Sequence, residues 1–248
     1  MSFFYIYSQN QIDRTRIKNL ILYNNDCRVL HEFITDKSYF LANTKESLIS
    51  NFHGGKLIAV GDINHQNDSN ISKSISNYED FNSFGKYSCN NLYGDYLLIG
   101  IEKDKSKIHF FRSLCSRKYV FYYQDNKTLI ATSSVKLIFD FLRKTPQIYL
   151  PYMVSYIKRH FIESPETSFE NVSEMMRGCT SKFSGSKIYS NKLIWNPIEQ
   201  CKKSINDNSF KDQMIFNMNN IMNSNLKNAT KIVLDFSGGF DSTTLLHS

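Results

Sequence analysis

A short polar loop near the end of the chain lies between two apolar stretches. The run reads Ile232-Val233-Leu234-Asp235-Phe236-Ser237-Gly238-Gly239-Phe240-Asp241-Ser242-Thr243-Thr244-Leu245-Leu246. Two adjacent glycines let the backbone turn sharply and bring its N–H groups against a ligand. A helix that begins near Ser242 adds unpaired N–H groups and the positive end of its dipole at the same point. The pattern therefore predicts a binding site for phosphate groups.

Five residues of this loop are the candidate nucleotide-binding residues: Ser237, Gly238, Gly239, Asp241 and Ser242. The serine hydroxyls are additional donors, and the Asp241 carboxylate is suited to hold Mg²⁺ between phosphates or to cap the following helix. The loop contains no lysine. It is therefore neither the lysine-bearing loop of kinases and GTPases nor the three-glycine fingerprint of dinucleotide-binding folds.

The Ser-Gly-Gly-x-Asp-Ser sequence resembles the PP-loop of ATP pyrophosphatases, and its context resembles asparagine synthetase and its relatives. Further segments line up with that family in the same order: Gly94-Asp95-Tyr96, Arg112-Ser113, Val120-Phe121-Tyr122-Tyr123, Ala131-Thr132-Ser133-Ser134-Val135-Lys136, 148–160, 165–172 and Trp195-Asn196-Pro197. The resemblance implies a mixed α/β chain in which a degenerate Ntn-type α/β/β/α amidotransferase-like domain precedes the first strand, loop and helix of a PP-loop domain. We expect the amidotransferase-like domain over 1–145, a linker and the start of the synthetase region over 146–205, and the truncated PP-loop domain over 206–248.

This resemblance also implies a chemistry and a set of partners. ATP and Mg²⁺ would bind at the PP-loop, with Asp241 on the metal, and a substrate carboxylate from aspartate or from a peptide side chain would be activated as an acyl-adenylate. An amine would then form the amide, which in the parent family leads to asparagine. One alternative is the lasso-peptide macrolactam cyclase branch, where an acidic residue often lies at the position of Asp235. Another is a non-catalytic binding or assembly module.

The N-terminus departs from the glutamine-hydrolysing members of the family. Those members carry a nucleophilic cysteine directly after the initiator methionine, whereas this chain has Ser2, followed by Phe3 and Phe4 where the family has glycine. A serine hydroxyl has a far higher pKa than a thiol and needs stronger activation. The sequence therefore predicts that Ser2 is not a working glutaminase nucleophile.

Hydrophobic patterning predicts the elements that would position these residues. Strands are expected over 3–7, 57–63, 92–101, 108–112, 119–123, 128–132 and 232–236, and helices over 12–22, 134–142, with Ser133 or Ser134 as its cap, and from about 242. The strands between 92 and 132 are expected to form one antiparallel meander, and 71–90 is expected to be irregular. One strand and one helical turn cannot bury their own apolar faces, so we expect 230–248 to need a complementing downstream polypeptide and the chain to be inactive by itself.

Composition indicates a globular protein and excludes several classes of function. The chain of 248 residues is 41% hydrophobic and 14% aromatic, with a net charge of +7. Its lysines are scattered with no basic run of five, which argues against a nucleic-acid partner. Five cysteines without a Cys-x-x-Cys pair favour reduced thiols, and the sequence offers no signal peptide or membrane-spanning stretch, so a cytoplasmic protein is expected. The six histidines show no metal-ligand spacing.

Overall fold

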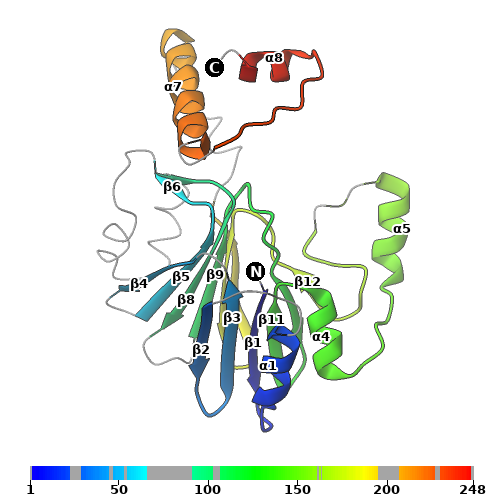
Figure 1. Cartoon of the computed structure of the whole chain (residues 1–248). Helices are drawn as coiled ribbons and strands as arrows, with labels where there is room; N and C mark the ends of the chain where they lie inside the picture. The colour runs from blue at the N-terminus through cyan, green and yellow to red at the C-terminus, as the bar shows by residue number, and fades with distance from the viewer. Residues whose placement is uncertain are drawn as a thin grey trace. The chain divides into compact units, whose positions relative to one another are not determined.

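The structure is a computed structural model of the chain, and it describes residues 2–22, 29–44, 47–52, 55–65, 91–102, 107–160, 162, 164–194, 207–226 and 230–246. The chain forms two compact units, Met1–Trp195 and Asn196–Ser248. Figure 1 shows the strands gathered in the first unit and two helices in the second. Each unit is described by itself below.

The first sheet is built around strand β1 (Ser2–Ser8). Its strands follow the order β12-β10-β11-β1-β3-β2 and all pair antiparallel: β12 (Val172–Glu174), β10 (Phe121–Gln124), β11 (Thr128–Thr132), β3 (Ser38–Thr44) and β2 (Val29–Ile34). Residues Phe3 to Ile6 of β1 are all buried. A strand that is buried on both faces reads as a continuous apolar run, and this explains why β1 lies in the interior of the sheet rather than at its edge.

The second sheet has the order β14-β13-β9-β8-β5-β4 and is also antiparallel. Its strands are β14 (Lys187–Leu193), β13 (Cys179–Ser184), β9 (Lys107–Arg112), β8 (Tyr96–Glu102), β5 (Gly55–Gly61) and β4 (Ser47–Phe52). Two short strands, β6 (Asn64–His65) and β7 (Leu92–Tyr93), pair separately with each other.

The core lies between the two sheets. Alternate side chains of β1 point to opposite faces, so Phe3 and Tyr5 join one hydrophobic cluster while Phe4 and Ile6 join another. Phe3 meets Phe110 of β9 with ring centroids 5.5 Å apart, which packs one sheet against the other. The side chains of β1 therefore pack on both faces of the first sheet.

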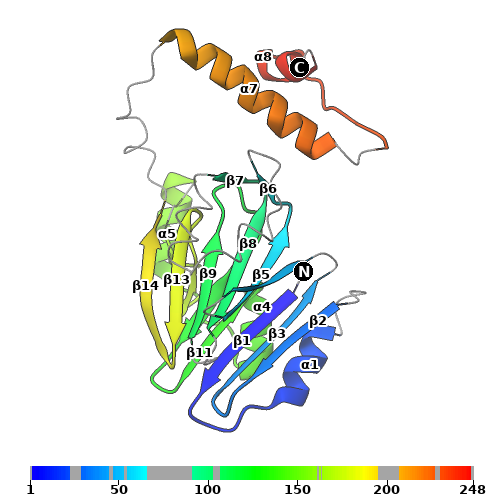
Figure 2. The same cartoon turned by 90° about the vertical axis from the view of Figure 1, so that its left-hand side faces the viewer.

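Helices α1 (Arg14–Leu22) and α4 (Val135–Leu142) cover the outer face of the first sheet. They contribute Ile17, Ile21, Leu137 and Ile138 to the cluster that contains Phe4. Figure 2 shows the two sheets with α1 beside β2 and β3. The described layers are thus helix, sheet and sheet.

Most predicted elements of the first unit are confirmed, including both helices over 12–22 and 134–142. Ser134 is the N-cap of α4 but its side chain makes no capping bond, while Ser133 Oγ accepts the N–H of Phe3 at 3.3 Å. A further helix, α5 (Leu150–Arg159), lies within the segment 148–160 that carries the family resemblance. The segment 71–90 lies outside the described residues.

The expectation of a single meander between 92 and 132 is wrong. Strands β8 and β9 pair in the second sheet, whereas β10 and β11 pair in the first. The chain crosses between the sheets over 113–120, where Val120 is fully buried and anchors the crossing in the core. Hydrophobic alternation identifies strands, but it does not state which sheet a hairpin joins.

The first compact unit also extends further than the expected boundary at residue 145. Strand β12 pairs with β10 in the first sheet, and β13 pairs with β9 in the second. Residues 172–193 therefore complete both sheets instead of linking two domains. The resemblance had placed these residues in the linker and the start of the synthetase region, 146–205.

The second unit contains α7 (Asp207–Leu226), which the sequence did not predict, and α8 (Phe240–Leu246). Apolar residues of α7 are spread over several faces and many are exposed, including Phe210, Met214, Phe216 and Ile221. The expected strand over 232–236 is not formed in the described structure, where these residues pair with no strand and Val233 is 81% exposed. A strand needs a neighbouring strand for its backbone hydrogen bonds, and the described part of this unit offers none.

Candidate functional site

The Ser-Gly-Gly-Phe-Asp-Ser loop folds back on itself just before α8. Ser237 Oγ and Ser242 Oγ lie 3.2 Å apart, although five positions separate them in the sequence. Ser237 Oγ also accepts the N–H of Gly239 at 3.3 Å, and Ser242 Oγ donates to the Gly239 carbonyl at 3.1 Å. The two serines at the ends of the predicted site are therefore brought together.

Gly238 provides the turn that this closure requires. Its φ is +75°, a conformation that side chains with a Cβ rarely adopt, and a Cβ built there would meet nothing within 4 Å. The backbone at this point is accordingly open to a ligand. Phosphate oxygens bind to backbone N–H and hydroxyl donors, and here the Gly239 N–H and the Ser242 hydroxyl would have to exchange their bonds within the loop for bonds to a ligand.

Asp241 lies in the first turn of α8 and is exposed. Among the described residues, no group of three or more histidine, cysteine, aspartate or glutamate side chains is arranged to hold a metal ion. Asp241 would thus contribute one carboxylate, and phosphate oxygens would supply other ligands to Mg²⁺. The loop as described lies on an exposed surface.

Ser2, in contrast, lies at the start of β1 and is half-buried. It pairs across the sheet with Asn43 of β3. Asn43 is fully buried, and within the described part of the chain neither atom of its side-chain amide has a hydrogen-bond partner. The sequence analysis missed Asn43, because a single asparagine inside a strand carries no distinctive signal.

The residues after Ser2 are committed to packing. Phe3 and Phe4 are completely buried on opposite faces of the sheet. The Phe3 backbone is fixed as well, since its carbonyl accepts the Thr132 hydroxyl at 2.8 Å. Phe3 and Phe4 therefore belong to the hydrophobic core of the first unit.

Two segments that carry the family resemblance meet at the crossing between the sheets. Asp95 accepts hydrogen bonds from the backbone N–H of Arg117 at 2.8 Å and from Lys118 Nζ at 3.2 Å. Burial raises the pKa of the Asp95 carboxyl, but these bonds together outweigh burial and lower it. Asp95 therefore fixes the 113–118 loop as an ionised structural residue.

A second ionised cluster is centred on Glu102 at the end of β8. Glu102 Oε1 lies 2.7 Å from His109 Nε2 and 3.2 Å from Lys182 Nζ, and Oε2 lies 3.1 Å from Lys107 Nζ. Burial acts to raise the pKa of Glu102, yet the hydrogen bonds to these three partners dominate and lower it from 4.5 to about 2. The cluster joins β8, β9 and β13.

This cluster predicts a loss of stability in acid. A carboxyl with a lowered pKa in the folded state stabilises the fold above its unfolded pKa and loses that contribution as the pH falls toward the folded value. We expect the Glu102 contribution, about 2 to 3 kcal/mol, to disappear between pH 5 and pH 2. Urea unfolding of the wild type and of Glu102→Gln across this range should show their difference shrinking as the pH falls. A difference that stays constant with pH would contradict the prediction.

Comparison with known proteins supports the architecture and does not extend to a family. No protein-family model matches the sequence, and neither does any curated protein. Among solved structures, the chain is similar to the glutamine phosphoribosylpyrophosphate amidotransferase of B. subtilis, described as complexed with ADP and GMP, with 10% identity and a TM-score of 0.48. It is also similar to a structure described as the allosteric regulatory enzyme of purine biosynthesis, with 8% identity and a TM-score of 0.50.

In each comparison the match covers 79% of this chain and 49% of the solved chain. The chain therefore spans about half the length of either enzyme. At this level of identity the similarity concerns the fold alone, and it agrees with the mixed α/β class and the two packed antiparallel sheets expected for the first part of the chain; it does not reach the expected PP-loop part. Within the described residues, no helix is both long and apolar enough to cross a membrane.

Proposed function

We propose that this chain belongs to an ATP-dependent enzyme that forms amide bonds, of the asparagine synthetase type, and that it lacks glutaminase activity. The observation that carries the proposal is the Ser-Gly-Gly-Phe-Asp-Ser loop, whose two outer serines lie 3.2 Å apart, following an amidotransferase-like pair of sheets in the same chain. The order of these two parts is the order found in the family that the sequence resembles.

The loop residues would act on the leaving group of the reaction. A carboxylate oxygen of the substrate attacks the α-phosphorus of ATP, the bond from that phosphorus to the β-phosphate oxygen breaks, and pyrophosphate leaves. The backbone N–H groups at Gly238 and Gly239 and the hydroxyls of Ser237 and Ser242 would hold the pyrophosphate oxygens. Mg²⁺ supplies additional neutralisation of phosphate charge, with Asp241 as the protein ligand.

The amidotransferase-like part would serve as a scaffold in this proposal. Ser2 replaces the family cysteine, Phe3 and Phe4 fill the adjacent space, and the amine would therefore come from a source other than hydrolysis of glutamine at this site. Ammonia and a peptide amine are the two amine classes that the family uses. The second of these corresponds to a macrolactam cyclase, which acts on a peptide carboxylate instead of free aspartate.

Exchange of labelled pyrophosphate into ATP tests the proposal. The purified chain would be assayed with Mg²⁺ and aspartate, alone and together with the polypeptide encoded immediately downstream. We expect exchange that depends on the carboxylate and on the downstream polypeptide, because the exposed 232–236 segment lacks a sheet to join. Exchange supported by a peptide with an acidic side chain, and not by aspartate, would favour the cyclase. Absence of exchange with every carboxylate would reject adenylation and leave a binding module.

A further inference from the structure

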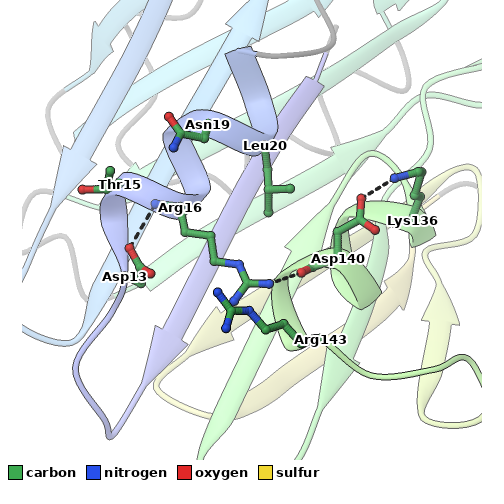
Figure 3. A pocket seen from close by; sticks show the side chains of 8 residues that line it. All are labelled: Asp13, Thr15, Arg16, Asn19, Leu20, Lys136, Asp140 and Arg143. Carbon is green, nitrogen blue, oxygen red and sulfur yellow. Dashed lines mark hydrogen bonds and ion pairs between the residues drawn. The ribbon is translucent and has the colours of Figure 1, made fainter.

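A cleft of about 520 Å³ lies between α1 and the C-terminal end of α4, within the first unit. It is lined by Asp13, Thr15, Arg16, Asn19, Leu20, Lys136, Asp140 and Arg143, and Figure 3 shows these side chains. A cleft of this volume is in the range that holds a small organic ligand. It lies in a different unit from the Ser-Gly-Gly-Phe-Asp-Ser loop.

Most of the charged groups in the cleft already have partners. Lys136 Nζ lies 2.5 Å from Asp140 Oδ2, and Asp13 Oδ1 accepts the backbone N–H of Arg16 at 3.0 Å, which caps the first turn of α1. The Arg16 guanidinium donates to the Asp140 carbonyl. Each of the two carboxylates in the cleft thus has a partner, and among the described residues neither is paired with Arg143.

Arg143 is the group that the fold leaves uncommitted. It follows α4 with a φ of +54°, and its backbone N–H donates to the Phe139 carbonyl. The N–H of Lys144 donates to the same carbonyl at 3.4 Å, and Arg16 bonds the Asp140 carbonyl, so the end of α4 is capped without the Arg143 side chain. Among the described residues its guanidinium makes no hydrogen bond or ion pair. Figure 3 shows this side chain turned along the cleft toward Arg16.

Two neutral side chains also line the cleft, and Figure 3 shows them pointing away from the guanidiniums of Arg16 and Arg143. Thr15 and Asn19 lie on α1, and neither side chain has a bonding partner in the part of the chain that the structure describes. Guanidinium groups, in contrast, bind planar and tetrahedral oxyanions through paired N–H donors. The three cations of the cleft, Arg16, Lys136 and Arg143, exceed its two carboxylates by one charge, and this excess favours an anion over a cation.

From this arrangement we infer that the α1–α4 cleft binds a small molecule through a phosphate monoester group, with the guanidiniums of Arg143 and Arg16 on the phosphate. A phosphate is preferred to a carboxylate because donors from two elements approach from different directions, and a tetrahedral dianion accepts bonds in more directions than a planar monoanion. This site is independent of the proposed ATP site and of the proposed function.

Titration of the full chain with inorganic phosphate at constant ionic strength tests the inference. The measurement would follow the NMR signals of the Arg143 and Arg16 Nε–H groups, which lie in this cleft. We expect saturable shifts, and an affinity at least fivefold weaker in Arg143→Gln. Arg14→Gln removes the same charge from α1 outside the cleft and should change the affinity less than twofold, as should the paired variant Ser237→Ala with Ser242→Ala.

Arg143→Gly separates binding from a structural role. Glycine adopts a positive φ without strain, so this variant should melt at the same or a higher temperature than the wild type while losing phosphate affinity as Arg143→Gln does. Shifts that do not saturate, or an equal loss of affinity in Arg14→Gln, would overturn the inference. Tighter Arg143-dependent binding of succinate than of phosphate would overturn the choice of phosphate.

Discussion

Replacing Arg112 by methionine should lower the free energy of unfolding by about 3 to 5 kcal/mol. Arg112 is 1% exposed, and its guanidinium links the second sheet to the first. One nitrogen, Nη1, lies 2.6 Å from Glu174 Oε1 and 2.6 Å from the carbonyl of Met175. Methionine fills a similar volume but leaves a carboxylate and a buried carbonyl without their donor, and that loss is the main cause of the expected effect. Urea unfolding at pH 7 measures it.

Arg117 offers a matched control for this experiment. It is also an arginine, it lies in the loop that follows β9, and it pairs with Asp95 at 3.1 Å, but its side chain is 81% exposed. Exposed ion pairs contribute little, so Arg117→Met should cost less than about 0.5 kcal/mol. Similar losses of unfolding free energy in both variants would show that the contribution of Arg112 to stability does not depend on its burial. A second variant, Arg112→Met with Glu174→Met, should recover part of the stability because it removes the unpaired carboxylate.

The contrast between these two arginines also shows how much of the structure can be predicted from the sequence. The resemblance at Arg112-Ser113 marks a position of structural importance, but nothing in the sequence states that Arg112 reaches Glu174, 62 positions later. Local patterning predicts β1 from its continuous apolar run and α4 from apolar residues at helical spacing. Pairings such as that of β10 with β12 depend on packing across the whole domain, and short polar strands like Val172–Glu174 carry too little pattern to reveal them.

The candidate sites, too, could be predicted only in part from the sequence. The Ser-Gly-Gly-Phe-Asp-Ser loop is visible in the sequence because glycine and serine at fixed spacing have a local geometric purpose, and the structure brings Ser237 and Ser242 together. The uncommitted Arg143 was not visible, because its surroundings are created by α1, a helix more than a hundred positions earlier. The strand expected over 232–236 is not formed for a different reason. Its apolar run has strand character, but hydrogen-bonding neighbours are needed to make a strand of it.

Exchange of pyrophosphate into ATP, once reconstituted, should fall at least about 100-fold in Asp241→Asn. Asparagine keeps the size of the side chain and removes the charge that would hold Mg²⁺ against the phosphates. Asp241 is exposed in the first turn of α8 and no ion pair in the described structure involves it, so the substitution should leave the melting temperature unchanged. The expected defect is therefore one of catalysis and metal binding, separable from folding.

The dependence on Mg²⁺ concentration distinguishes the metal role of Asp241 from a general effect of charge. If Asp241 is a metal ligand, raising Mg²⁺ should recover part of the exchange in Asp241→Asn, because a weaker site fills at a higher concentration of ion. Asp212→Asn removes an exposed carboxylate from α7 in the same unit and should leave exchange within twofold of the wild type. Equal losses in the two variants would mean that Asp241 acts only through the net charge of the unit. A loss in Asp241→Asn that Mg²⁺ does not relieve would instead place this carboxylate on the substrate or on the helix N-terminus, where its position in the first turn of α8 also allows it to act.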